Sequence, residues 1–226
     1  MKSLYLLFLL FIGLNVFAQD KSSDYPIDSL VSPDYPVDSL YLTVEDTFID
    51  TLVLKNEKTY KTLASALKNP DKVYKLNLTR QKLKTFPPEI FQLKELRVLD
   101  LSYNKINIVP SEIGTLTKLQ TLDLSSNKIA ELPKEIGELK NLKVFHINRN
   151  DLVTVPSQIG HLRKLEILDM WSNEIDSLPK EMRYLINLKE LELRSILIDD
   201  QTQERIKSVV PKTTKIYMSP SCNCKY

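Results

Sequence analysis

The sequence is poor in the residues on which disulfide scaffolds and metal centres depend. Its 226 residues include two cysteines, two histidines, four glycines and one tryptophan. Two cysteines are too few for a disulfide scaffold, and two histidines leave little room for a histidine-rich metal centre. The formal net charge is +2, which gives no indication of nucleic-acid binding. The chain also lacks a phosphate-binding loop, a metal-binding helix motif and a nucleophile elbow. We therefore predict no metal, no cofactor and no nucleic-acid partner.

Residues 1–18 have the organisation of a secretory signal peptide. Met1 and Lys2 give a basic start, positions 4–17 form a nearly unbroken apolar run, and Val16 and Ala18 are small residues at the −3 and −1 positions of a cleavage site. This run is too short for a membrane anchor, because an apolar run that spans a bilayer needs ~20 residues. We therefore predict cleavage after Ala18, no transmembrane anchor, and a protein that is secreted or extracytoplasmic, in the periplasm or at the cell surface.

Residues 19–50 form an acidic segment that contains a local duplication. Eight acidic residues against one lysine give it a net charge of −7, whereas residues 55–226 carry 29 basic and 21 acidic residues, a net charge of +8. Residues 24–30 (Asp-Tyr-Pro-Ile-Asp-Ser-Leu) recur at 34–40 with valine in place of isoleucine. We interpret the segment as a solvated linker. The alternatives are a docking segment that presents Tyr-Pro pairs, a stalk whose Asp-Ser/Thr-aliphatic triplets resemble bacterial O-glycan acceptors, and an arm that screens the basic part of the chain.

From Leu76 onward, apolar residues recur at a fixed spacing, and each reappears 23 positions later. Each period contains two apolar residues separated by one position: Leu76 and Leu78, Leu99 and Leu101, Leu122 and Leu124, Phe145 and Ile147, Leu168 and Met170, Leu191 and Leu193. Five positions after the first member stands an asparagine in four periods: Asn104, Asn127, Asn150 and Asn173. A period of this length indicates a solenoid. Within a short strand, alternation sends both apolar side chains to one face.

These residues resemble the leucine-rich repeat family, whose unit reads L-x-x-L-x-L-x-x-N-x-L. Six such units cover residues 73–198, and their second halves, for example residues 109–114, are similar to the subclass with a Pro-x-x-Ile-Gly-x-Leu return segment. The resemblance implies an α/β fold class, a leucine-rich-repeat solenoid with a parallel sheet on its concave face. It also implies a binding module for a protein or peptide partner.

A solenoid needs closed ends, and the segments on both sides of the repeats are predicted to supply them. Residues 51–72 are the predicted N-terminal cap and residues 199–226 the predicted C-terminal cap. The elements expected in the two caps are a strand at 51–54, a helix at 60–67, a helix from Asp199 or Asp200 to Val210, and a strand at 215–218. Near the end of the sequence stand Cys222 and Cys224. They could form a small strained disulfide with each other or a bridge to another chain.

Two sets of repeated residues are predicted to have structural roles. The four asparagines fall at the corner between strand and loop, where backbone groups need partners, so we expect them to form a hydrogen-bonded ladder. Gly114, Gly137 and Gly160 occupy one repeat position, and we expect each to serve a tight backbone turn.

The residues between the paired apolar positions are predicted to face solvent on the concave side of the sheet. Those that depart from the ordinary unit of the family cluster late in the chain, and Trp171 is the only tryptophan. Tryptophan, tyrosine and arginine are the usual anchors of binding hot spots, although Trp171 could instead cover the stems of neighbouring side chains. The predicted partner-binding residues are Arg80, Tyr103, His146, Asn148, Arg149, Asp169, Trp171, Glu192 and Arg194.

Two other functions remain alternatives to protein or peptide binding. An envelope or adhesive component could bind a surface glycan through Trp171, Tyr103 and Asn148. A hydrolase could use His146, with Ser125 as the nearest candidate nucleophile. An open sheet neither excludes water nor supplies an oxyanion hole, so we predict that the protein is not an enzyme.

Overall fold

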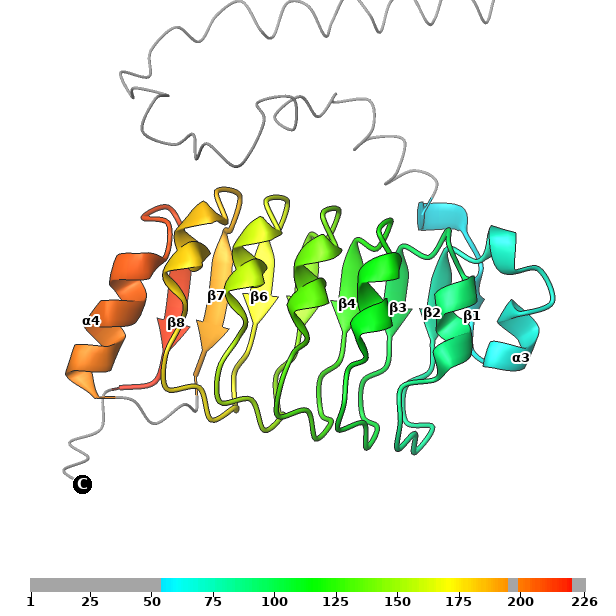
Figure 1. The fold of residues 1–226 in the computed structure, drawn as a ribbon, viewed down its shortest axis with the longest axis horizontal. Coiled ribbons are helices and arrows are strands. Elements are labelled where there is room, and N and C mark those ends of the chain that lie inside the picture. Colours follow the sequence, from blue (N-terminus) through cyan, green and yellow to red (C-terminus); the bar gives the residue numbers. More distant parts are fainter. Residues whose placement is uncertain (1–53, 195–198, 221–226) are drawn as a thin grey trace, which may run out of the picture. The chain divides into compact units, whose positions relative to one another are not determined.

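The computed structural model describes residues 54–194 and 199–220 (Figure 1). The predicted signal peptide, the acidic segment and both cysteines lie outside the described residues. The chain divides into two compact units, residues 1–56 and 57–226, and the fold below is that of the second unit.

Eight parallel strands form one sheet in which the order of the strands is the order of the chain. The strands are β1 (Thr59–Tyr60), β2 (Lys75–Asn77), β3 (Val98–Asp100), β4 (Thr121–Asp123), β5 (Val144–His146), β6 (Ile167–Asp169), β7 (Glu190–Leu193) and β8 (Lys215–Met218). From β2 to β7 each residue pairs with the residue 23 positions later, as in Leu76 with Leu99. The sequence period is therefore the register of the sheet, and the predicted solenoid is confirmed.

Short 3₁₀ helices carry the chain back along one face of the sheet (Figure 1). The five within the repeats are η4 (Pro88–Gln92), η5 (Ser111–Thr115), η6 (Lys134–Glu138), η7 (Ser157–His161) and η8 (Lys180–Tyr184). A proline precedes each of them at the N-cap, with φ between −67° and −74°. The pyrrolidine ring fixes this angle and so directs the chain into the return segment. In the described part of the chain, no helix has the length and the apolar character needed to cross a membrane.

The core lies between the sheet and the 3₁₀ helices. The paired apolar residues of β2 to β7 are all buried, with at most 1% of their surface exposed. Ile113, Ile136, Ile159 and Met182 reach the same core from the 3₁₀ helices and are fully buried. Burial of one such side chain contributes about 1.5–3 kcal/mol. Because each repeat covers only its neighbours, the stability of the unit accumulates along the chain.

The predicted asparagine ladder is confirmed. Asn150 Oδ1 accepts a hydrogen bond from the Ile129 N–H at 3.0 Å, and its Nδ2 donates to the carbonyls of Leu124 and Ile147, both at 3.0 Å. The bonds with Ile129 and Leu124 join the repeat of Asn150 to the preceding repeat, whereas the bond with Ile147 lies within one repeat. The same pattern is repeated at Asn104, Asn127 and Asn173. The residue before each asparagine adopts a left-handed conformation, with φ of 54° or 55°: Tyr103, Ser126, Arg149 and Ser172.

The three glycines do lie in tight backbone turns, since each is within a 3₁₀ helix, but none of them has a positive φ, so these turns do not require the conformational freedom of glycine. They instead allow adjacent 3₁₀ helices to approach each other closely. A Cβ atom on Gly137 would lie 2.5 Å from the carbonyl oxygen of Gln158, and one on Gly160 would lie 2.5 Å from that of Glu181. At Gly114 the nearest carbonyl oxygen would be 3.0 Å away. Lack of a side chain, and not conformational freedom, is what the position requires.

The described part of the N-terminal cap differs from its prediction at Leu54 and in the extent of the helix. Residues 51–53 of the predicted strand at 51–54 lie outside the described residues. Leu54, its last position, belongs to a helical turn, and the first described strand is β1. The helix predicted over 60–67 is limited to α3 (Leu63–Ala66). It begins late because the side chain of Thr62 is the N-cap and accepts a hydrogen bond from the Ser65 N–H.

The C-terminal cap has the predicted elements. The helix α4 (Asp200–Val209) begins after Asp199, whose side chain accepts a hydrogen bond from the Thr202 N–H at 2.7 Å. Ile206 and Val210 are buried against the last repeat. Strand β8 pairs in parallel with β7 and so occupies the edge that β7 would otherwise leave open.

Candidate functional site on the open face of the sheet

The candidate site lies on the face of the sheet turned away from the 3₁₀ helices, which we call the sheet face. It is the face predicted to be concave. The register aligns one residue from each of β2 to β8 in a central row: Asn77, Asp100, Asp123, His146, Asp169, Glu192 and Tyr217. Neighbouring strands are ~4.8 Å apart, so each inner member of the row lies next to two others.

The carboxylates of the central row are fixed by the backbone. Each accepts a hydrogen bond from the N–H two residues later, at 2.9 Å for Asp100, 2.8 Å for Asp123, 3.4 Å for Asp169 and 3.0 Å for Glu192. A carboxylate with a backbone donor at the end of a strand keeps one orientation. The row therefore presents negative charge in defined positions and does not depend on mobile side chains.

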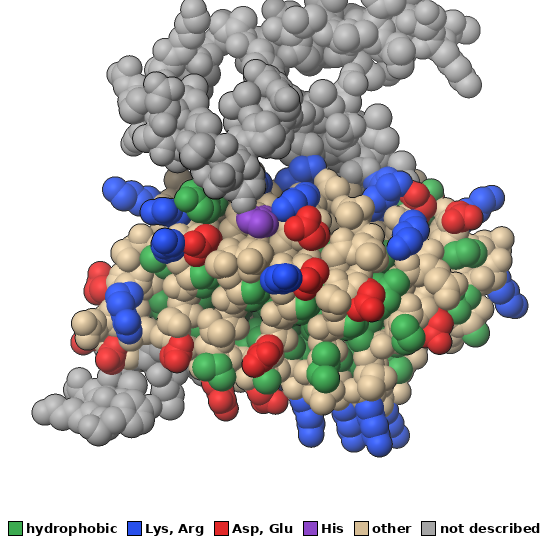
Figure 2. All heavy atoms as spheres, in the orientation of Figure 1, with side chains coloured by type: hydrophobic (Ala, Val, Ile, Leu, Met, Phe, Trp, Pro, Cys, Tyr) green, Lys and Arg blue, Asp and Glu red, His purple; other side chains and the backbone are tan. Residues whose placement is uncertain are grey.

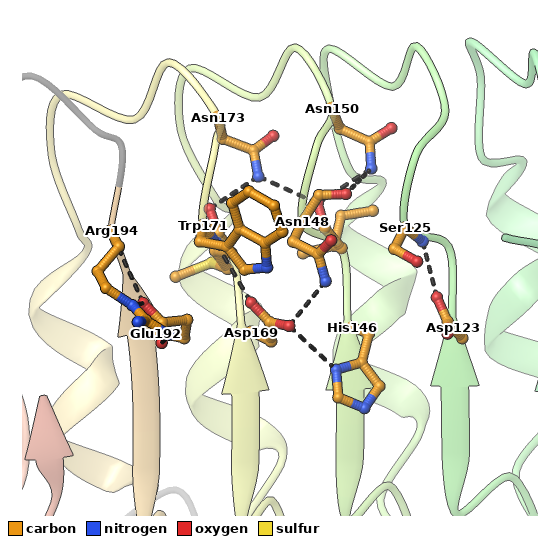
Figure 3. Close-up of polar contacts among 12 residues, drawn as sticks. Asp123, Ser125, His146, Asn148, Asn150, Asp169, Trp171, Asn173, Glu192 and Arg194 are labelled. Atoms are coloured by element: carbon orange, nitrogen blue, oxygen red, sulfur yellow. Dashed lines mark hydrogen bonds and ion pairs between the residues drawn. The ribbon is translucent and has the colours of Figure 1, made fainter. Parts of the chain in front are cut away.

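His146 interrupts this acidic row and is held by one of its neighbours. Figure 3 shows the carboxylate of Asp169 between His146 and Asn148. His146 Nδ1 lies 3.3 Å from Asp169 Oδ2, and Asn148 Nδ2 donates to the same oxygen at 2.7 Å. The hydrogen bond with Asp169 raises the pKa of His146; the charges of Asp123, Asp169 and Asp100 add to this effect, and burial opposes it. When the imidazole is protonated, it places a positive charge within a negative row.

Trp171 and Arg149 form an aromatic and cationic pair at the end of the adjacent strands. The guanidinium carbon of Arg149 lies 5.3 Å from the centre of the Trp171 ring, which is within the range of a cation–π interaction. The Arg149 N–H also donates to the Trp171 carbonyl at 2.9 Å. Trp171 is half-buried and Arg149 is exposed. The pair places an apolar ring and a positive charge side by side on the sheet face.

A second cationic group follows on the next two strands. Arg194 Nε and Nη2 donate to the two oxygens of Glu192 at 2.8 and 2.6 Å, and the guanidinium carbon lies 5.9 Å from the Tyr217 ring. Tyr217 is 42% exposed and was missed from the sequence. Strand β8 does not follow the repeat period, so its residues fall outside the repeated columns. The alternation of charged or aromatic with apolar residues along 215–218 could have predicted that Tyr217 faces the same side as the central row.

The structure brings most of the predicted partner-binding residues together. Six of them lie in or directly after β5, β6 and β7 (Figure 3): His146, Asn148, Asp169, Trp171, Glu192 and Arg194. Arg149 follows Asn148 after β5. Arg80 and Tyr103 form a separate pair at the other end of the sheet, with 4.8 Å between the guanidinium carbon and the ring centre. Asn148 is 8% exposed, so it positions Asp169 and presents little surface of its own.

The residues of the two alternative functions are less favourably placed. Tyr103 follows β3 and Trp171 follows β6, so three strand spacings, ~14 Å, separate the aromatic residues of the glycan site. Ser125 is 7% exposed, and the imidazole of His146 is engaged by Asp169. Within the described residues, no group of three histidine, cysteine, aspartate or glutamate side chains could hold a metal ion.

A parallel single-sheet solenoid with an asparagine ladder and an open sheet face defines a class of repeat protein. Two models of that class match the chain, one described as a leucine-rich repeat region over residues 121–216 and one as a leucine-rich repeat over residues 71–129. The chain belongs to the leucine-rich repeat family. Proteins of this family commonly mediate protein–protein interactions and are typically binding modules without enzymatic activity. No curated relative matches the sequence.

Solved structures of three bacterial and plant proteins are similar to the chain. A leucine-rich repeat protein of Leptospira interrogans is 34% identical, with a TM-score of 0.59, and the match covers 74% of this chain and 49% of that one. An internalin of Listeria monocytogenes is 20% identical, with a TM-score of 0.58 and coverage of 71% and 46%. The ectodomain of the receptor kinase GASSHO1/SCHENGEN3 of Arabidopsis thaliana, in complex with Casparian strip integrity factor 2, is 26% identical, with a TM-score of 0.52 and coverage of 73% and 23%. The chain thus spans about half the length of the first two proteins.

Proposed function

We propose that the protein is an exported binding module that holds a protein or peptide partner on its sheet face, centred on Trp171 and Arg149. The observation that carries this proposal is the juxtaposition of that pair with the fixed carboxylate of Asp169. Tryptophan and arginine are among the side chains that dominate hot spots between proteins, and the nearby carboxylate adds a charge that a partner can complement.

The rigidity of the frame favours recognition of an extended partner. The asparagine ladder ties each repeat to the one before it, and the carboxylates of the central row are held by backbone donors. A ligand that lies across the strands therefore meets side chains already in place, which lowers the entropic cost of binding. Repeat proteins use extended surfaces of this kind for partners that run along several units.

The chemistry of the sheet face defines the partner further. The central row is acidic from Asp100 to Glu192, with His146 as its only interruption, while Arg149 and Arg194 lie beside it. A complementary partner carries basic groups along the central row and an apolar or acidic group against Trp171 and the two guanidinium groups.

The proposal of export depends on the signal-peptide organisation of residues 1–18. One of the similar structures supports it, because that structure is also of a protein outside the cytoplasm. It is the ectodomain of a plant membrane receptor kinase bound to an integrity factor. Fractionation of cells that produce the tagged protein tests this part of the proposal. The processed chain should begin at Gln19 and lie outside the cytoplasm; an unprocessed cytoplasmic chain would contradict it.

Selection from a displayed library of random peptides tests the binding site. Peptides enriched on the purified protein should lose at least about tenfold in affinity for Trp171→Ala or Arg149→Ala, because a hot-spot residue contributes more than ~1.4 kcal/mol. The matched control is Tyr184→Ala with Arg183→Ala on η8, which removes an arginine–aromatic pair with a 5.1 Å separation from the opposite side of the sheet.

Three results would contradict the site. The enriched peptides could bind Trp171→Ala as well as wild type, or the η8 control could weaken them equally. The protein could also fail to enrich peptides and instead give a glycan-array signal that Trp171→Ala abolishes, which would assign a glycan to the same face.

A further inference from the structure

The loops that follow β2 to β6 carry an ordered distribution of charge. We call them together the loop edge, and they comprise residues 82–86, 105–109, 128–132, 151–155 and 174–178. All their charged side chains are exposed. From the first loop to the fifth these side chains are Lys82 and Lys84; Lys105; Lys128 and Glu131; Asp151; and Glu174 and Asp176.

The net charges of the five loops are therefore +2, +1, 0, −1 and −2. Figure 2 shows lysine and arginine side chains gathered on one part of the lower edge of the molecule and acidic side chains on the next part. No ion pair within the described part of the chain uses any of the eight charged side chains of the loop edge. Among the described residues, therefore, no ion pair neutralises the gradient.

Exposed apolar side chains lie between the charged ends of the loop edge. Ile108 in the second loop is 67% exposed and Val153 in the fourth is 45% exposed. Ala130 is exposed in the third loop between them. An apolar centre with charged groups at its borders is the usual anatomy of a protein interface.

The charge order of the loop edge is complementary to the same order read in the reverse direction. A two-fold axis through the third loop places the first loop of one copy against the fifth loop of the other, and the second against the fourth. The +2 loop then meets the −2 loop and Lys105 meets Asp151, while Ile108 meets Val153. Such an interface is isologous, because both copies use the same residues. A parallel arrangement would instead place like charges together.

We propose that the loop edge is a self-association surface that binds a second copy of this chain in antiparallel orientation. The proposal is independent of the proposed function, because the loop edge and the sheet face are built from different residues. A dimer formed in this way leaves both sheet faces open. It carries two partner sites, and a ligand with repeated epitopes would then bind with avidity.

The loop edge is short, which sets the expected strength of the dimer. Five loops span four strand spacings, ~19 Å. Contacts that bury less than ~1,200 Å² are typical of weak, transient complexes. The dimer fraction should therefore rise with protein concentration and fall with salt, because the screening length decreases from ~30 Å at 0.01 M to ~3 Å at 1 M.

Sedimentation velocity of two charge-reversed variants tests the proposal. The basic-end variant is Lys82→Glu with Lys84→Glu, and the acidic-end variant is Glu174→Lys with Asp176→Lys. Each should be monomeric at concentrations where the wild-type protein dimerises at low salt, because its first and fifth loops then have the same sign. An equimolar mixture of the two variants should restore the dimer, since each reversed loop then meets a loop of opposite charge.

The control variant is Lys134→Glu with Lys180→Glu, which makes the same net charge change as the basic-end variant at exposed positions of η6 and η8. It should dimerise like wild type. Circular dichroism of each variant confirms that it is folded. A wild-type protein that stays monomeric at low salt, variants that dimerise like wild type, or a mixture that stays monomeric would each overturn the proposal.

Discussion

Replacement of Gly137 by alanine tests whether the glycines hold successive 3₁₀ helices in contact. The new Cβ would lie 2.5 Å from the carbonyl oxygen of Gln158 and 2.8 Å from the Cβ of that residue. Ordinary contact begins near 3.4 Å, so η6 and η7 must separate by nearly an ångström at this point. Gly160 is in the same situation, whereas at Gly114 the nearest atom is 3.0 Å away and a shift of a few tenths of an ångström is enough.

The magnitude follows from two opposing effects. Alanine in place of glycine at a compatible φ stabilises a protein by about 0.4–1 kcal/mol, because the unfolded chain has less freedom to lose. Overpacking in a close contact costs about 1–3 kcal/mol. We therefore expect Gly137→Ala and Gly160→Ala to lower the free energy of unfolding by about 1–2 kcal/mol. For Gly114→Ala the two effects nearly cancel, and the change should be close to zero.

Urea unfolding followed by circular dichroism measures the three variants against wild type. The midpoints of Gly137→Ala and Gly160→Ala should fall with an unchanged m-value, and their Tm should fall by about 2–4 °C per kcal/mol. Gly114→Ala is the internal control, because it makes the same chemical change at the equivalent position. Equal destabilisation of all three variants is the result that a turn role would give, and it would refute the close-approach explanation. Wild-type stability of Gly137→Ala would refute it as well.

Three further substitutions probe the frame and the sheet face. Asn150→Ala should lower the free energy of unfolding by about 2–4 kcal/mol, because buried carbonyl and N–H groups lose their partners; a loss below ~1 kcal/mol in urea unfolding would contradict the ladder. Ser126→Gly should raise the free energy of unfolding by about 0.5 kcal/mol, because relief of the left-handed conformation (φ 54°) outweighs the entropy that glycine adds to the unfolded chain. A lower Tm than that of wild type would contradict this reasoning. The pKa of His146 is raised in the folded protein, mainly by the hydrogen bond with Asp169. The protonated side chain therefore stabilises the fold fully when the pH is below the ordinary pKa of histidine, and this stabilisation is lost as the pH rises through the higher pKa of the folded state. The destabilisation by His146→Gln should therefore be larger at about pH 5.5 than at about pH 8.5, and equal values at the two would exclude this coupling.

The periodic parts of the fold were predictable because each depends on contacts between equivalent residues of adjacent repeats. Leu99 pairs with Leu122 for the same reason that Leu76 pairs with Leu99, so one spacing fixes the whole register. The cap helix after Asp199 was predictable because an N-cap is a local interaction. The N-terminal strand was placed at 51–54 because an apolar run was the only available signal. The described strand, β1, includes a threonine and a tyrosine whose pairing with β2 is a long-range contact.

The candidate site was predictable as a set of positions and not as a set of contacts. The columns of equivalent repeat residues placed Trp171 and Arg149 side by side, but their cation–π contact depends on how the side chains turn at the end of each strand. Asn148 was expected to face a ligand and is instead buried against Asp169. Tyr217 joins the site only because β8 pairs with β7, which the repeat period does not encode.

The sequence by itself determined the repeat, the parallel register, the asparagine ladder and the faces of the sheet, because a fixed period allows only one way for neighbouring units to bury their leucines. Only the tertiary structure decided why the glycines are there, which residues of the sheet face touch, and that the loops form a single charged edge. These three features depend on distances between atoms of different repeats. A period specifies which residues are equivalent, but it does not specify how closely the backbones approach or where the side chains turn.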